Sequence, residues 1–257
     1  MANSMTLIQC TALALAAFAG GLAFGVSGFA YGVVASLFLH HAFAPREVVF
    51  LVVGGGTLLN LAFLPRFWKQ VNLPGAVPYI VGATFGLPIG LVLLTLLQPV
   101  WVRGFTSALI LAYCFVALSR QGRAPLRLAP VNGHIADVGI GLGGGIVGGV
   151  AGLGPLLPSV WYGLRGLNKL QARGLTQPFG LFVQGAMLIW FLASGAMEPR
   201  SVLHLATAAP LTFLGAWMGA RLFDSVSTAA FQRIILGLSM LGAAALLLRQ
   251  LVQSLTA

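Results

Sequence analysis

Long apolar segments separated by short polar or charged stretches make up almost the whole chain. They cover residues 7–40, 48–65, 74–97, 100–119, 134–164, 174–197, 201–222 and 228–254. A membrane-spanning helix needs about 20 apolar residues, so six of these segments fit one helix each. Segments 7–40 and 134–164 are too long, because straight helices of that length would measure roughly 45–50 Å against a hydrocarbon core of about 30 Å. We therefore expect both long segments to be broken.

Each of the two long segments contains a glycine-rich cluster. The first reads GVSGFAYG, from Gly25 to Gly32, and the second reads GGGIVGGVAGLGPLLP, from Gly143 to Pro158. Glycine adopts conformations that end a helix, and proline removes a backbone donor. In lipid, a helix break is tolerated only where it lines a cavity or is buried in protein. The clusters predict discontinuous helices or hairpins, with a working site where they break.

The two halves of the chain also align with one another. GVSGFA, starting at Gly25, superposes on GVAGLG, starting at Gly149, and the same shift of 124 sets Asn60 opposite Gln184. GLPIG at 86–90 and GAWMG at 215–219 match at a slightly larger shift. The alignment predicts two repeats, although agreement by chance in a glycine-rich chain is the alternative.

These patterns define the expected architecture. We expect an all-α polytopic membrane protein with a single transmembrane domain over residues 1–257. Repeat 1 covers 1–119, a basic cytoplasmic linker covers 120–133, and repeat 2 covers 134–257. Each repeat would hold one long discontinuous or hairpin segment and three transmembrane helices.

Composition supports a membrane protein. The chain of 257 residues is 58% hydrophobic and 7% charged, whereas soluble domains carry roughly 25% charged residues. Its net charge of +10, from fourteen basic residues against four acids, fits loop charge that faces anionic headgroups. No basic block is interleaved with exposed aromatic residues, so we do not expect nucleic-acid binding.

Loop charges favour the hairpin arrangement. If all eight segments cross the membrane once, the basic residues divide seven to seven and give no orientation signal. If the two long segments enter and leave on one face, the division becomes ten to four, and the outer four are Arg46, Arg103, Arg200 and Arg249. Lys and Arg accumulate on the cytoplasmic side, so this arrangement is favoured. Its odd number of crossings per half inverts the repeats, as in many transporters, while a parallel arrangement stays open.

The cluster residues are the first candidates for a substrate site. A half-helix that begins at a break directs N–H groups and the positive end of its dipole into the membrane, which suits a small anion. The candidates are Gly25, Ser27, Gly28, Gly152, Gly154 and Pro155. The alternative is close packing of small residues four apart, for which Gly21 with Gly25 and Gly145 with Gly149 qualify.

Polar side chains inside the following spans are the next candidates. They are Thr57, Asn60, Thr176, Gln177 and Gln184. Intramembrane polar groups are commonly functional, but they also serve as hydrogen bonds between helices. Asn60 and Gln184 are the stronger candidates for a functional role, because they occupy matched positions in the two halves.

Four charged residues near the segments need an explanation. Arg173 either snorkels to headgroups or points inward to pair with an anionic substrate. Arg46 and Glu47 are expected to form an interfacial ion pair. Asp137 is the one acid close to a segment interior, and it is a candidate for proton coupling or an acid that meets a helix dipole near its start.

We expect no metal, disulfide or cofactor. Cys10 and Cys114 both lie within apolar runs, and the histidines (His40, His41, His134 and His204) fall near segment ends and not on one helical face.

These motifs together resemble the TauE/SafE-like permeases, also called the sulfite exporter or toluene-sulfonate uptake permease family. The similarity lies in the broken first segment, the second cluster, the entry Ala172-Arg173-Gly174, and GAWMGAR ending at Arg221. The family typically shows GxGGG followed by proline in each repeat, and here the first cluster has Ser27 and Tyr31 instead. The resemblance implies movement of sulfite or organosulfonates across the bacterial inner membrane.

We consequently expect a secondary transporter with alternating access at a midplane site between the two broken segments. The substrate would be a small sulfur oxyanion or sulfonate, and the lipid bilayer would be its other partner. A different class stays open, because GVSGFAYG also looks like the GxSG motif of rhomboid proteases, with Ser27 as nucleophile. Three features oppose the protease interpretation. The serine lies in the first segment, no histidine falls in mid-span, and the second cluster has no serine.

Overall fold

The structure is a computed structural model that describes residues 5–119 and 130–225, with positions 237, 240, 242–244 and 247–248 beyond them. Most of the expected linker and of the expected last segment, 228–254, lies outside these residues. The described part is built of helices, and seven of them are long and apolar enough to cross a membrane. The expectation of an all-α polytopic membrane protein is confirmed.

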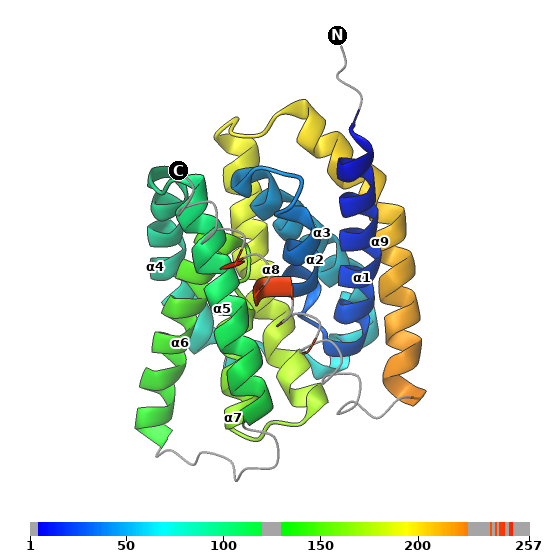
Figure 1. The fold of residues 1–257 in the computed structure, drawn as a ribbon. Helices are drawn as coiled ribbons and strands as arrows, with labels where there is room; N and C mark the ends of the chain where they lie inside the picture. The colour runs from blue at the N-terminus through cyan, green and yellow to red at the C-terminus, as the bar shows by residue number, and fades with distance from the viewer. Residues whose placement is uncertain are drawn as a thin grey trace.

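The first half contains five α-helices and a short 3-10 turn (Figure 1). They are α1 (Leu7–Ser27), α2 (Tyr31–Leu39), α3 (Pro45–Phe67), η1 (Trp68–Gln70), α4 (Leu73–Leu96) and α5 (Pro99–Ser119). The second half contains α6 (Pro130–Ala151), α7 (Leu156–Leu164), α8 (Lys169–Ala193) and α9 (Pro199–Ser225). The helix α6 therefore takes in the last residues of the expected linker.

The helix starts follow from local sequence. A proline occupies the first position of α3, α5, α6 and α9, where its missing N–H costs no hydrogen bond. At α1, the Thr6 hydroxyl accepts from the Gln9 N–H at 3.3 Å, and the Gln9 side chain accepts from the Thr6 N–H at 3.1 Å. Asn168 and Gln171 form the same capping box at α8.

Both long segments are hairpins. Contacts of Gly215 with Phe18 and of Gly219 with Leu22 show that α1 and α9 run parallel, so they start at the same end. The loop after α2 is at that end too, because Phe43 packs on His204 near the start of α9. Likewise, the chain after α7 returns to the start of α6, where a Cβ on Gly133 would lie 3.6 Å from Nη1 of Arg165. The hairpin α1–α2 opens at the upper end of Figure 1 and α6–α7 at the lower end.

Helices from different halves form the closest pairs. Three glycines of α4 lie against the backbone of α6: a Cβ on Gly82, Gly86 or Gly90 would come within 2.3 Å of a carbonyl oxygen. Gly21 and Gly25 of α1 meet α9 in the same way. Close approach of small residues drives helix association in lipid. The packing interpretation of these flanking glycines is therefore correct.

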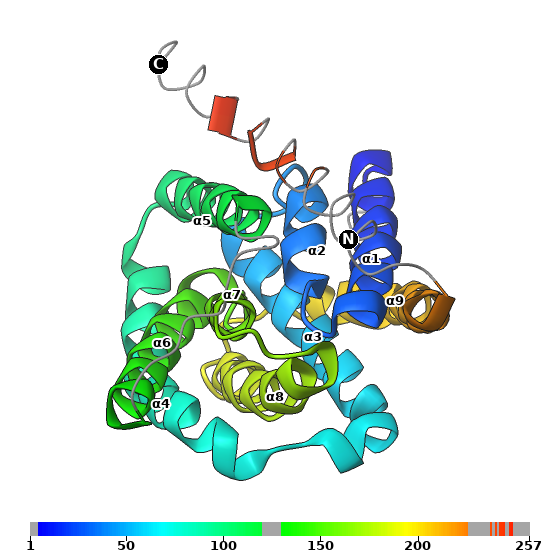
Figure 2. The same ribbon diagram turned by 90° about the horizontal axis from the view of Figure 1, so that it is seen from below.

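The central helices are α3 and α8, with α2 and α7 beside them (Figure 2). Their apolar windows are the most buried, at 67% for α3 and 56% for α8. On the periphery, α4 exposes large apolar side chains at a spacing of three to four residues, namely Val77, Val81, Phe85, Ile89 and Val92. That stripe faces lipid, while the glycines of the same helix face α6.

Candidate functional site

The first helix break is fixed by Gly28. Its φ of +86° is a left-handed conformation that ends α1, and its N–H bonds the Phe24 carbonyl at 2.6 Å. The neighbouring Ser27 hydroxyl donates to the Ala23 carbonyl at 2.7 Å and accepts from the N–H groups of Phe29 and Ala30. Ser27 thus caps the turn, and its proton is engaged by backbone.

The second break has the same geometry. Gly152 has φ +73°, and its N–H bonds the Gly148 carbonyl at 2.7 Å. In place of a serine cap, the chain continues through Gly154 and Pro155, and the Leu156 N–H bonds the Leu153 carbonyl. Because Pro155 and Pro158 carry no N–H, the start of α7 offers fewer donors than the start of α2.

The two breaks face each other across a small cavity. Gly32, in the first turn of α2, is so close to Leu153 that a Cβ would lie 2.7 Å from its side chain. The cavity holds about 10 Å³, room for about one water. Its lining comes from both breaks and from α8: Phe29, Gly32, Val33, Gly152, Leu153, Pro155, Leu156 and Gln184.

A buried amide pair lies beside this cavity. The Asn60 side-chain Nδ2 donates to the Gln184 Oε1 at 3.0 Å and to the Gly56 carbonyl at 2.9 Å. Gln177 Nε2 donates to the Asn60 carbonyl at 3.2 Å. The three residues join α3 to α8 and are at most 5% exposed. Thr57 and Thr176 are buried as well, but their hydroxyls bond carbonyls of their own helices, Val53 and Ala172.

Arg173 points inward. It lies in the second turn of α8, is 5% exposed, and its guanidinium carbon is 3.9 Å from the centre of the Phe67 ring. It also lies against the first break, because a Cβ on Gly28 would be 3.0 Å from its Nε. The snorkelling interpretation is wrong: the capping box begins α8 at Lys169, which puts Arg173 already inside the bundle.

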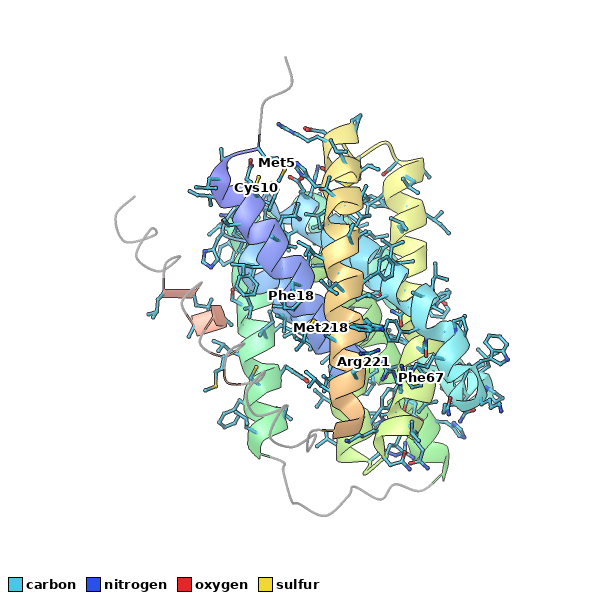
Figure 3. The ribbon with its side chains drawn as sticks, turned by 90° about the vertical axis from the view of Figure 1, so that its right-hand side faces the viewer. Met5, Cys10, Phe18, Phe67, Met218 and Arg221 are labelled. Carbon is cyan, nitrogen blue, oxygen red and sulfur yellow. The ribbon has the colours of Figure 1, made fainter. Side chains whose placement is uncertain are left out.

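Arg173 forms the inner part of a basic cavity of about 590 Å³ between the end of α3, the start of α8 and the end of α9. Its lining is Arg66, Phe67, Asn168, Lys169, Leu170, Arg173 and Ala220. Figure 3 shows Phe67 and Arg221 at this end of the molecule. The charged side chains among these described lining residues are all basic, and clefts with such a lining concentrate anions.

Asp137 lies away from both breaks. One carboxylate oxygen accepts from the Tyr79 hydroxyl at 2.5 Å, from Trp161 Nε1 at 2.6 Å and from Arg165 Nη1 at 3.2 Å. The dipole interpretation is wrong, since α6 begins at Pro130 and Asp137 lies well inside it. Its contacts tie the open end of the α6–α7 hairpin to α4.

The structure brings some predicted site residues together in two groups. Gly152, Pro155 and Gln184 line the small cavity, with Asn60 and Gln177 bonded beside it, and Gly28 lies against Arg173. Gly25 lies against the backbone of α9, and Ser27 is engaged by its own turn. The expected pair of Arg46 with Glu47 is replaced: Arg46 donates to the Thr95 carbonyl, and Glu47 contacts His204 at 2.8 Å and Ser201 at 3.1 Å.

Sequence reasoning missed Arg66, Phe67 and Lys169 as site residues. Arg66 and Lys169 had been assigned to the same face as Arg173 by the hairpin arrangement. Their common side of the membrane was the only indication in the sequence that they belong together. It did not show that the three cations line one cavity.

The comparison with family models decides the identity. The sulfite exporter TauE/SafE model matches residues 13–246, nearly the whole chain. The chain belongs to the TauE/SafE sulfite exporter family. Searches of curated proteins and of solved structures found no match.

TauE/SafE proteins are membrane transporters and not enzymes. The family match and the seven apolar helices identify this member as a multi-pass membrane protein. Nothing supports the protease interpretation of GVSGFAYG, and the Ser27 hydroxyl hydrogen bonds to backbone groups within the described part of the chain.

Proposed function

We propose that this TauE/SafE member is a secondary permease or exporter of small sulfur-containing anions such as sulfite or organosulfonates. The single observation that carries the proposal is the position of Arg173. This cation is buried against the first helix break and also lines the basic cavity. It is placed to draw an oxyanion from the cavity toward the breaks.

The substrate site is proposed between the two broken segments. Beside Arg173 it comprises the turn glycines Gly28, Gly152 and Gly154, Pro155, and the polar residues of α3 and α8, with Thr57 and Thr176 at its margin. The first-turn N–H groups of α2 have no carbonyl partner within that helix, and Gly32 and Val33 of this turn line the cavity between the breaks. Because that cavity holds about one water, substrate would enter only after the segments move apart.

Orientation in the bacterial inner membrane is part of the proposal. The end of α3, the turn η1, the end of α7, the start of α8 and the end of α9 lie at the lower end of Figure 1. They carry six of the described basic residues: Arg66, Lys69, Arg165, Lys169, Arg173 and Arg221. The starts of α3, α5 and α9 lie at the upper end and carry three: Arg46, Arg103 and Arg200. The positive-inside rule makes the lower end cytoplasmic, so the basic cavity would open toward the cytoplasm.

Export in this orientation is electrically favourable. An anion that leaves a cell with a negative interior gains about 2.3 kcal/mol per charge per 100 mV. Accumulated substrate could therefore leave without a coupling ion. Asp137 is the candidate for proton coupling that we rank last, because its carboxylate is held by three donors away from both breaks.

Thermal unfolding of the purified protein with sulfite, sulfate, thiosulfate and sulfoacetate tests the proposal. A ligand at 100 times its Kd stabilises the folded state by about 2.7 kcal/mol. We expect stabilisation by one or more sulfur anions, loss of it in Arg173→Ala, and partial recovery in Arg173→Lys. Lys69→Ala, an exposed cation on the same face outside the cavity lining, is the matched control.

Sulfite flux in proteoliposomes provides the second measurement. Arg173→Ala should abolish flux and Lys69→Ala should preserve it. If the wild-type protein shows neither anion-dependent stabilisation nor flux with any of the four anions, the proposed function is wrong. A folded Arg173→Ala variant that transports normally would remove Arg173 from the site.

A further inference from the structure

A polar network joins α3 to α9 at the end of the bundle opposite to Asp137. One carboxylate oxygen of Glu47, near the start of α3, accepts from the Ser201 hydroxyl at 3.1 Å and contacts Nδ1 of His204 at 2.8 Å. Ser201 and His204 belong to the first two turns of α9 and are buried. The Glu47 side chain is 22% exposed. A carboxylate that water can reach therefore holds the two helices together.

Deeper in the bundle, α3 and α9 stay in contact as far as the first break. A Cβ on Gly54 would lie 2.5 Å from the Leu205 side chain, and one on Gly55 would lie 2.3 Å from the Tyr31 hydroxyl. Tyr31 is the first residue of α2, and its side chain also contacts Thr212 of α9. Separation of α3 from α9 would therefore uncover the start of α2, which directly follows the first break.

The Asp137 network differs from the Glu47 network in its chemistry. The donors to Asp137 are a phenol, an indole and a guanidinium, and these groups do not ordinarily change charge between pH 5 and 8. Histidine is the side chain that ordinarily does so. Of these two networks, the one that contains His204 can therefore respond to a change of pH in this range.

We propose that Glu47, Ser201 and His204 form an outer latch that is controlled by a proton bound between Glu47 and His204. The inference rests on the proposed function, because it assumes alternating access. With the proton bound, an imidazolium lies beside a carboxylate, and such charge-assisted hydrogen bonds are roughly twice as strong as neutral ones. When α3 moves away from α9, His204 loses Glu47, so the closed state holds the proton more tightly than the open state. Lower external pH therefore favours the closed latch.

Other titratable and charged groups of the described chain lie at this end. The loop after α2 packs Phe43 on the His204 ring, and the Phe43 carbonyl accepts from Arg103 of α5 at 3.4 Å. The remaining groups are His40 and His41 before Phe43, Cys10 of α1, Arg46 of α3, and Glu198 and Arg200 at the turn into α9. The response of His204 must therefore be separated from that of the two neighbouring histidines.

Cysteine accessibility tests the latch without any substrate. Thr212→Cys is introduced into a full-length parent without Cys10 and Cys114, at a position that is 2% exposed. A small membrane-impermeant methanethiosulfonate is applied to right-side-out and to inverted vesicles, so the result does not depend on the proposed orientation. At each pH the labelling rate is divided by that of the same protein with His204→Gln. This ratio cancels the effect of pH on the thiol and on the other histidines.

Glutamine keeps an N–H donor for Glu47 but cannot take up a proton. We expect the ratio to fall by at least about five-fold from pH 8 to pH 5.5, since coupling between sites typically changes an equilibrium by 5- to 150-fold. Glu47→Gln keeps an acceptor oxygen and removes the charge, so it should abolish this fall. Glu198→Gln, the same change at a 76% exposed side chain of this end, is the matched control and should behave as the parent. His41→Gln, at an exposed histidine, should do so too.

The outer latch is wrong if the ratio stays constant with pH, or if Glu47→Gln and Glu198→Gln label alike. Should Glu47→Gln fail to fold, the pH series of the parent, His204→Gln and His41→Gln still decides. Intact sulfite flux in wild-type proteoliposomes would leave the proposed function standing after such a result. If the wild type transports no sulfur anion, the proposed function fails and labelling alone decides the latch.

Discussion

At the scale of single residues, the amide pair Asn60–Gln184 links the two halves of the chain. Their hydrogen bond joins residues that occupy matched positions, and it lies where α3 and α8 cross the centre of the bundle. The helix α8 also supplies a second hydrogen bond, from Gln177 to the Asn60 carbonyl. Relative movement of α3 and α8 would have to rearrange these bonds.

The strength of the pair can be measured with a double-mutant cycle on Asn60→Ala and Gln184→Ala. Hydrogen bonds between membrane helices contribute about 0.6 kcal/mol on average and at most about 1.7. We expect a coupling free energy in this range from reversible unfolding in detergent. Thr57→Ala and Thr176→Ala form the control cycle and should be additive, because each hydroxyl bonds its own helix.

The sequence predicted the matched positions of Asn60 and Gln184 but neither their hydrogen bond nor the basic cavity. A fixed shift between the halves was enough to set Asn60 opposite Gln184. Arg66, Phe67 and Lys169 belong to the ends of two different helices, and their convergence depends on how the chain turns through η1. The positions of Arg66 and Arg173 in the sequence therefore did not show that both lie over the Phe67 ring.

At the scale of elements, two glycines in left-handed conformation determine where the long segments turn. Gly28 and Gly152 end α1 and α6 with the same backbone hydrogen bond, and the length argument from the sequence located both breaks. The sequence did not show that Ser27 would cap the turn. The role of Ser27 depends on whether its hydroxyl hydrogen bonds to a backbone N–H of the turn or points into the cavity.

Alanine substitutions test this element. An L-residue in the left-handed region costs about 1–2 kcal/mol, so Gly28→Ala and Gly152→Ala should each destabilise the protein by that amount. Gly139→Ala and Gly163→Ala are the controls, because both glycines are helical and a Cβ there meets nothing within 4 Å. Alanine should gain about 0.5–1 kcal/mol at such helical positions. Equal changes in unfolding free energy at all four positions, measured by thermal unfolding, would contradict the left-handed conformation of Gly28 and Gly152.

At the scale of the whole molecule, the two halves are interleaved. We propose that they are inverted repeats over 1–119 and 134–257, a relation supported by the matched breaks and by hairpins that open at opposite ends. The glycine contacts tie α1 to α9 and α4 to α6. In the proposed alternating access, each rocking body would therefore contain helices from both repeats.

Orientation is tested by labelling single cysteines from each side of the membrane. In a variant without Cys10 and Cys114, Lys69→Cys should react with an impermeant maleimide only from the cytoplasmic side, and Arg200→Cys only from outside. The reason is the charge asymmetry, with six described basic residues at one end and three at the other. The reverse labelling pattern would place the opening of the basic cavity outside the cell and contradict export by the proposed route.

The pairing of α1 with α9 has a consequence for how the protein is made. The ribosome delivers α1 to the membrane first among these helices and α9 last, so the glycine face of α1 must wait in lipid until α9 has been synthesised. The partner of α4, by contrast, follows after one further helix. The order of the helices therefore separates an early assembly step, α4 with α6, from a late one, α1 with α9. The α1–α2 hairpin can adopt its final position only after α9 has entered the membrane.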